Sequence, residues 1–132
     1  MNILLIGIGG SFGAILRYLL NEMIHKYIHT TLPIGILIVN VVGCFLIGLV
    51  LGNTLVSKDH SYYFFVIGFL GSFTTMSAFS YQVVELFNSN ILFACSYIIL
   101  MILMTILATY IGINFSIFLS KHDWFKKSQR KY

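Results

Sequence analysis

The chain has 132 residues, of which 58% are hydrophobic, 16% aromatic and only 9% charged. Soluble domains carry about a quarter charged residues, so this composition cannot cover a water-facing surface, and a soluble globular fold is excluded. Disorder is excluded as well, because so apolar a chain would not stay solvated. One domain of four membrane crossings, at about 20 residues each, would use nearly the whole length.

Four apolar blocks follow one another along the sequence, and we predict that each forms a membrane-spanning helix. Short polar turns separate them, and Pro33 suits the first turn of the second helix. No block alternates polarity with a period of two, which excludes a lipid-exposed β-barrel. We therefore predict an all-α membrane protein with one domain, residues 1–132, whose spans cover residues 3–24, 33–52, 62–87 and 91–119.

Basic residues are concentrated after the fourth block. The net charge is +4, and five of the eight Lys and Arg residues lie in the tail of residues 121–132. A basic segment directly after an apolar run is typical of a cytoplasmic anchor that faces anionic lipid. We therefore expect membrane lipid, and not nucleic acid, as the partner of this tail.

The placement of charge also predicts an orientation. With four spans, both termini and the 53–61 loop lie on one side of the membrane. That side carries six basic residues, Lys58 and the five in the tail, whereas the other side carries Lys26 and at most Arg17. The positive-inside rule then predicts a multi-pass plasma-membrane protein with both termini in the cytoplasm.

Nothing in the sequence indicates an enzyme, and we predict no catalytic residues. No Ser-His-Asp order, P-loop or HExxH motif occurs. Cys44 and Cys95 form no CxxC pattern, so neither a disulfide framework nor a cysteine metal site is indicated. The four carboxylates all lie at block ends or in loops: Glu22, Asp59, Glu85 and Asp123.

Arg17 and Asn40 are the polar side chains inside apolar blocks that most clearly need an explanation. Arg17, in the first block, is either a functional intramembrane charge or a side chain that reaches the interface from a helix end. Asn40 lies at the centre of the most apolar block, where its amide must find hydrogen-bond partners. It therefore either ties two helices together or binds a permeating ligand.

The third block contains a poor helix-forming sequence. Residues 68–81 contain two glycines, five hydroxyl residues and two β-branched threonines. We predict that the helix breaks near residues 71–75, at mid-membrane depth, and exposes carbonyl oxygens that can bind a small cation such as Na⁺. In the fourth block, Tyr97, Met101 and Thr105 form one stripe, which indicates either a polar track or ordinary packing.

Small residues four positions apart predict where helices approach closely. Gly9 with Gly13, Gly48 with Gly52, and Gly68 with Ser72 have this spacing. They indicate either packing within one bundle or contacts between subunits.

Three motifs in order give the chain a resemblance to the CrcB/Fluc family of small fluoride channels over essentially its whole length. They are GGSFGA at residues 9–14 with Arg17 and Tyr18, residues 35–45 around Asn40, and GFLG at 68–71 with TTMSAFS at 74–80. The resemblance implies an antiparallel dual-topology dimer with two narrow fluoride pores and a structural Na⁺ at its centre, where the broken third helices meet.

The resemblance also implies roles for individual residues. Backbone carbonyls of Gly71 and Thr74 would bind Na⁺, Asn40 would donate its amide hydrogens to fluoride, and Arg17 would support the first helix. The remaining residues of the implied pathway are the aromatic Phe79, Met76 where the family usually has Phe, and the hydroxyl donors Thr75, Ser77, Tyr97 and Thr105. Ile36 and Met101 depart from the family as well, because they replace a threonine and a hydroxyl residue.

The function predicted from this resemblance is passive export of fluoride. Two alternatives remain: a proton-coupled exporter of the small multidrug-resistance type, and a non-conducting partner subunit. The first needs a mid-membrane carboxylate in the first span, where only Glu22, near the block end, is present. Because the charge bias fixes one orientation, we also predict a heterodimer with an oppositely oriented paralogue.

Overall fold

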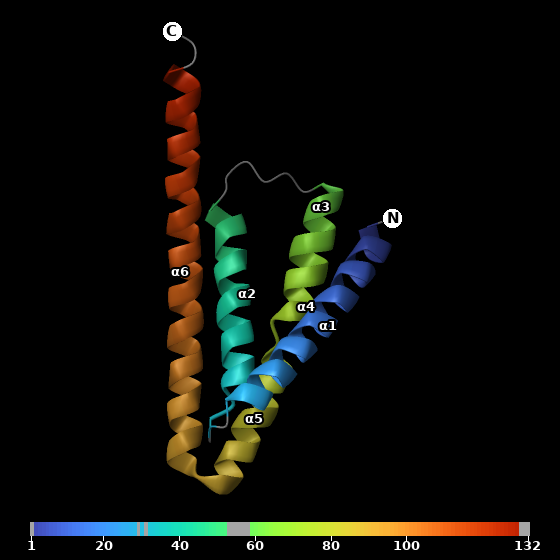
Figure 1. Cartoon of the computed structure of the whole chain (residues 1–132), viewed down its shortest axis with the longest axis vertical. Coiled ribbons are helices and arrows are strands. Elements are labelled where there is room, and N and C mark those ends of the chain that lie inside the picture. Colours follow the sequence, from blue (N-terminus) through green and yellow to red (C-terminus); the bar gives the residue numbers. More distant parts are fainter. Residues whose placement is uncertain (1, 29, 31, 53–58, 130–132) are drawn as a thin grey trace.

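The computed structural model describes residues 2–28, 30, 32–52 and 59–129, with side chains to residue 120, and these residues are almost entirely helical. In chain order the helices are α1 (Asn2–Tyr27), α2 (Ile34–Gly52), α3 (His60–Tyr62), the π-helix η1 (Tyr63–Leu70), α4 (Gly71–Phe73), α5 (Met76–Ser89) and α6 (Ile91–Gln129). Figure 1 shows them as one elongated bundle. The predicted all-α fold is therefore confirmed.

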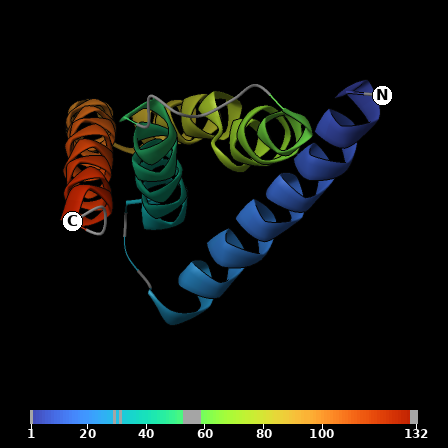
Figure 2. The same ribbon diagram turned by 90° about the horizontal axis from the view of Figure 1, so that it is seen from above.

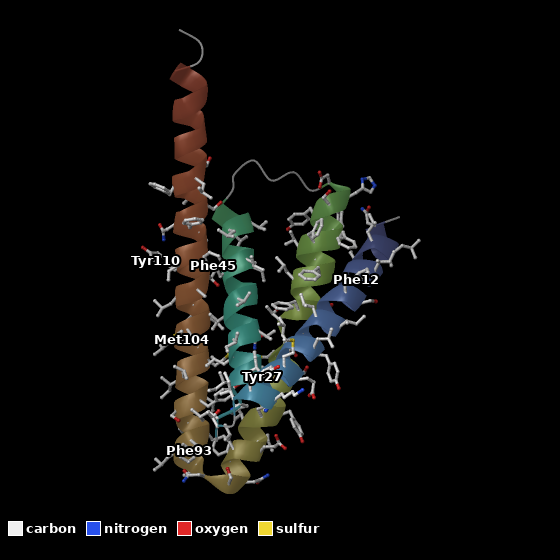
Figure 3. All side chains as sticks on the ribbon, in the orientation of Figure 1. Phe12, Tyr27, Phe45, Phe93, Met104 and Tyr110 are labelled. Carbon is white, nitrogen blue, oxygen red and sulfur yellow. The ribbon has the colours of Figure 1, made fainter. Side chains whose placement is uncertain are left out.

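Four helical stretches of the described chain are long and apolar enough to cross a membrane. Only 11–33% of the residues in their most apolar windows are buried inside the molecule. Large hydrophobic side chains therefore cover the outside, as Figure 3 shows for Phe93, Met104 and Tyr110 on the face of α6 turned away from α2. Outer faces so rich in apolar side chains must be covered by lipid or by a partner helix. The chain is therefore a multi-pass membrane protein.

Two pairs of helical segments form the bundle. α2 and α6 run side by side in the same direction (Figure 1), and they touch where Gly48 lies 3.1 Å from Gly112, measured from the position a Gly48 Cβ would take to the Gly112 Cα. α1 leans across η1 and α4, as the view from above shows (Figure 2). A Cβ added at Gly9 or Gly13 would fall against the carbonyl oxygens of Phe64 and Phe69.

The small residues singled out in the sequence therefore pack within the chain. Gly68 approaches the Ile6 carbonyl of α1, and Gly52 approaches the Ile113 carbonyl of α6. The approach of bare backbones at these points is what small residues permit in a membrane. Gly71 is different, because a Cβ there would meet only the Val66 carbonyl oxygen of the adjoining η1, at 3.9 Å, which is ordinary van der Waals contact.

The third apolar block contains several helical segments instead of one regular helix. Asp59 caps its start by accepting the backbone N–H of Tyr62 at 3.1 Å. η1 then follows a π-helical path, and the Gly71 N–H reaches the carbonyls of both Val66 and Gly68. A π-helical turn is uncommon and often marks a functional segment.

The last helix is longer than the fourth apolar block. α6 continues to Gln129, ten residues beyond the predicted end at residue 119. Asn90 starts it, with Oδ1 accepting the backbone N–H of Leu92 at 2.8 Å. Lys58 and the side chains of the basic tail, 121–132, on which the predicted orientation depends, lie outside the described residues.

Candidate functional site

Asn40 joins α2 to the junction between α4 and α5. Its side chain is only 7% exposed. The amide oxygen accepts the backbone N–H of Thr75 at 2.8 Å, and the amide nitrogen donates to the Thr75 carbonyl at 3.1 Å. Both polar atoms of one side chain thus bind the backbone of one residue, and the tie between helices, one of the two roles expected for Asn40, is observed.

This pairing leaves one amide hydrogen of Asn40 with a weak partner. Its other neighbour is the thioether sulfur of Met101, 3.8 Å from Nδ2. A thioether is a poor acceptor, so this N–H remains an effective donor for a better one. Asn40 can therefore hold Thr75 and still donate to a ligand.

The helix is interrupted at Thr74 and Thr75, and the interruption releases two carbonyl groups. Both residues have extended backbone, with ψ angles of 147° and 120°. The Thr75 N–H donates to Asn40, and the Ala78 N–H donates to Thr75 Oγ1 at 3.3 Å. In an unbroken α-helix these two N–H groups would donate to the carbonyls of Gly71 and Thr74.

The two released carbonyls are the ones the sequence analysis associated with Na⁺. They belong to Gly71, at the start of α4, and to Thr74 in the interruption itself. Neutral carbonyl oxygens without a helical donor are suitable ligands for a hard cation. The residues present therefore fit a Na⁺ site.

A groove of about 640 Å³ lies beside Asn40, between α2, α5 and α6. Five of the seven predicted pathway residues line it: Asn40, Thr75, Met76, Phe79 and Thr105. Met101 faces it from α6, whereas Val83, Val84 and Ile98 supply apolar wall. The groove thus combines a few neutral donors with an aromatic ring and no charged side chain.

Tyr97 is placed behind the groove. It is fully buried, and its ring centroid lies 5.7 Å from that of Phe79. Its hydroxyl lies 2.8 Å from Oε1 of Gln82 and 3.2 Å from the Pro33 carbonyl, both acceptors for its single hydrogen. Tyr97 therefore supports Phe79 and joins α6 to α5, and it has no hydrogen left for a ligand.

Three other singled-out residues lie at or beyond the rim. Met76 is 72% exposed, where an aromatic ring is usual in the family. Ser77 is exposed and hydrogen-bonded to Thr75 Oγ1 at 3.1 Å. Arg17 does not line the groove, and its buried Nε has no hydrogen-bond partner among the described residues.

The departures from the family pattern have different consequences. Met101 lines the groove, so its thioether replaces a hydroxyl donor beside Asn40. Ile36 lies in the apolar cluster with Phe79 and Tyr97 and does not reach the groove. Thr105, one turn after Met101, is the hydroxyl that remains on this face of α6, and it donates to the Met101 carbonyl at 2.7 Å.

Three residues at the site were not anticipated from the sequence: Gln82, Ser80 and Cys44. Gln82 binds the Tyr97 hydroxyl, while Ser80 and Cys44 line the groove. Gln82 could have been identified from the sequence in the same way as Asn40. It is also a neutral amide within an apolar block, and such an amide must find a hydrogen-bond partner. The other two are small enough to be read as packing residues.

Comparison with known proteins gives consistent matches. The family model described as CrcB-like protein, camphor resistance (CrcB), matches residues 4–113. A protein of Flavobacterium psychrophilum named fluoride-specific ion channel FluC is 40% identical over 112 residues, which is 82% of this chain and 90% of that protein. A protein of the same name from Clostridium novyi is 37% identical over 113 residues, which is 83% of this chain and 88% of that protein.

A third relative is similar to a comparable degree. The protein named fluoride-specific ion channel FluC 1 of Methanosarcina acetivorans is 40% identical over 114 residues, covering 83% of this chain and 86% of that protein. The matched region includes α1, α2, the interrupted third stretch and most of the membrane-spanning part of α6. With its four apolar helices and these matches, the chain belongs to the CrcB family.

Proposed function

We propose that this chain forms a fluoride channel that lets F⁻ leave the bacterial cytoplasm passively and so reduces fluoride toxicity. The observation that carries the proposal is the groove beside Asn40, in which neutral donors and an aromatic ring meet without any charged side chain. The relatives named as fluoride-specific ion channels support it.

The donors of the groove suit an ion that is costly to dehydrate. A fixed cation would bind fluoride tightly and hold it, whereas several neutral donors each replace part of its hydration shell. Such donors are the Asn40 N–H that now has only the weak acceptor Met101 Sδ, the hydroxyl groups of Thr75 and Thr105, and the positive ring edge of Phe79. Passage from one to the next needs no strong binding at any point.

Expression in bacterial cells that lack their own fluoride exporter tests this proposal. Fluoride enters acidified cells as HF and is trapped as F⁻, so such cells stop growing at low fluoride. Expression of the chain, together with any co-encoded paralogue, is expected to restore growth. No restoration by membrane-inserted protein would contradict the proposal.

We further propose that a structural Na⁺ binds the released carbonyls of Gly71 and Thr74. The ion would hold the two ends of the interrupted helix in place by satisfying oxygens that have lost their helical donors. An experimental structure in Na⁺ is expected to contain a dehydrated density within about 2.2–2.6 Å of both oxygens. Helical hydrogen bonds from Thr75 to Gly71 and from Ala78 to Thr74, with no such density, would contradict it.

The same proposal includes two further features. The interruption of the helix lies at mid-membrane depth, and the Na⁺ lies at the centre of an antiparallel dimer. Gly71 supports it, because a Cβ there would meet no atom of α1, α2 or α6 within 4 Å, which leaves room for a second subunit. Two carbonyls from each subunit would complete the ligand set of one shared ion.

We propose that the partner in this dimer is an oppositely oriented paralogue. The proposal depends on the six basic residues predicted on the side of the two termini, Lys58 and the five in the tail, against one or two on the other side. Topology reporters fused to each terminus, in cells that express the chain alone, are expected to show both termini inside. Roughly equal inside and outside populations would instead support a homodimer.

The role of a non-conducting partner subunit is the second candidate. Met76 and Met101 favour it, since both replace groups that would contact the ion in the groove. If the chain is such a subunit, the chain alone gives no fluoride flux. In the heterodimer, flux is then lost when the paralogue's pathway is mutated and is kept when only this chain's groove is mutated. The multidrug-exporter alternative is not favoured, because Glu22 is exposed near the end of α1.

A further inference from the structure

A second cavity adjoins the groove on the side toward the C-terminal end of α6. It has a volume of about 380 Å³ and is lined by Cys44, Thr105, Ile106, Thr109, Tyr110 and Ile113. Cys44 and Thr105 line both this cavity and the groove. The two spaces therefore meet at these two side chains.

The lining of the second cavity is mostly apolar, but one side chain with a polar group from each helix extends the groove's series of polar residues into it. On α2, Cys44 follows Asn40 by one helical turn, and on α6, Thr109 follows Thr105 by one turn. The Thr109 hydroxyl donates to the Thr105 carbonyl at 3.0 Å, just as Thr105 donates to Met101. Cys44 and Thr109 line the same cavity.

The contact between α2 and α6 limits where this path can go. One turn beyond Cys44, a Cβ at Gly48 would meet the Thr109 carbonyl and the backbone of Gly112, so no space remains between the two helices there. The second cavity instead borders Tyr110, which is 66% exposed. A path from Asn40 through both spaces therefore passes Cys44 and Thr109.

We infer that the fluoride path continues past Thr105 to the Thr109 hydroxyl and the Cys44 thiol, and that Cys44 is exposed to water inside it. This inference rests on the proposed function. Each hydroxyl donates to its own helix in the absence of an ion and can turn its O–H toward an anion. A lipid tail in the second cavity is the alternative occupant, and it would keep Cys44 dry and unreactive.

Thiol modification distinguishes these two occupants. The Cys44 thiolate attacks the sulfenyl sulfur of 2-sulfonatoethyl methanethiosulfonate, a mixed disulfide forms, the thiol proton goes to water, and methanesulfinate leaves with the electrons of the broken S–S bond. The charged reagent does not enter lipid, so it reacts only where water reaches the sulfur. The product places a fixed negative charge in the path.

The experiment measures fluoride efflux from liposomes before and after the reagent, with modification of each cysteine followed by mass spectrometry. We expect modification of Cys44 to lower efflux by at least about tenfold, because the bound sulfonate repels fluoride. The neutral reagent methyl methanethiosulfonate is expected to lower it less. Unmodified Cys44 in folded protein, or full modification with unchanged efflux, would overturn the inference.

Cys95 provides the matched control, since it is the other cysteine of the chain and is exposed on α6 away from both cavities. Cys95→Ala is expected to keep the wild-type rate and its full sensitivity to the reagent. The efflux that remains in Cys44→Ser is expected to be insensitive. If efflux before the reagent equals that of protein-free liposomes, the proposed function is wrong, and the mass spectrum still decides whether water reaches Cys44.

The role of the Thr109 hydroxyl has its own test. Thr109→Val keeps the shape of the side chain and removes its hydroxyl, and we expect efflux to fall about fivefold, the equivalent of one hydrogen bond. Thr109→Ser, which keeps the hydroxyl, is expected to retain most of the efflux. Equal efflux in the two variants would overturn this part of the inference.

Discussion

Asn40→Asp is expected to abolish fluoride efflux while the protein remains folded. An ionised carboxylate near the path would repel fluoride by about 4 kcal/mol at 4 Å and an effective dielectric constant of 20, which corresponds to about a thousandfold lower occupancy. A protonated carboxyl would donate its one hydrogen to the Thr75 carbonyl that Asn40 now binds, and none would remain for fluoride. Both protonation states therefore block the path.

The fold tolerates this change because at least one of the two hydrogen bonds between the side chain at position 40 and the Thr75 backbone remains. The remaining carboxyl oxygen still accepts the Thr75 N–H that Asn40 Oδ1 accepts at 2.8 Å. Efflux from liposomes and gel filtration in detergent measure the two effects separately. Wild-type efflux in a well-behaved Asn40→Asp preparation would remove Asn40 from the path.

Asn114→Asp provides a matched control for the substitution. Asn114 is also an asparagine on a membrane-spanning helix, but it is exposed, and its side chain donates only to the Tyr110 carbonyl of its own helix. The same loss of an amide and gain of a carboxyl therefore occurs away from the groove. We expect efflux close to the wild-type rate, and an equal loss in both variants would point to a general effect of charge.

Gly9→Ala and Gly13→Ala are each expected to destabilise the protein by about 1–3 kcal/mol. A Cβ at either position would fall against a backbone carbonyl of η1, from Phe64 or Phe69, which cannot rotate away as a side chain would. The helices must then separate. Because one displacement of α1 relieves both contacts, the double variant should cost less than the sum of the two.

Gly7→Ala is the control on the same helix. No atom lies within 4 Å of a Cβ placed at Gly7, so the substitution adds a better helix former without a clash. We expect the thermal unfolding temperature in detergent to stay the same or rise in this variant and to fall in the other two. Equal unfolding temperatures for all three variants would contradict the close packing of α1 on η1.

The number and type of the helices are predictable from the sequence because hydrophobicity alone determines which segments enter a membrane. Four apolar blocks of sufficient length therefore predict four helices. The need of Asn40 for a partner is predictable for the same reason, since an amide at that depth must be satisfied. Its actual partner, the backbone of Thr75, lies 35 positions away and follows only from the fold.

The depth of a side chain is harder to predict than the helix face on which it lies. The stripe of Tyr97, Met101 and Thr105 does face α2 and α5, but only Met101 and Thr105 reach the groove. Tyr97 turns its hydroxyl to Gln82 and Pro33, a direction set by where α5 and the start of α2 happen to pack. Periodicity contains no information about those neighbours.

The direction of backbone groups is also determined by tertiary contacts. A sequence with glycines and threonines predicts a weak helix near residues 71–75. It does not predict which carbonyls lose their donors, because that depends on Asn40 taking the Thr75 N–H and on Thr75 Oγ1 taking the Ala78 N–H. The π-helical path of η1 likewise has no residue pattern of its own.

Fluoride efflux from liposomes, recorded with a fluoride electrode, tests the central claim most directly. The chain is reconstituted alone and with any co-encoded paralogue, and chloride efflux is measured in the same preparations. If the chain forms a fluoride channel, fluoride efflux is expected to exceed chloride efflux by at least about a hundredfold, either from the chain alone or from the chain with its paralogue. Fluoride efflux no faster than from protein-free liposomes in both, or equal efflux of the two halides, would contradict the proposed function.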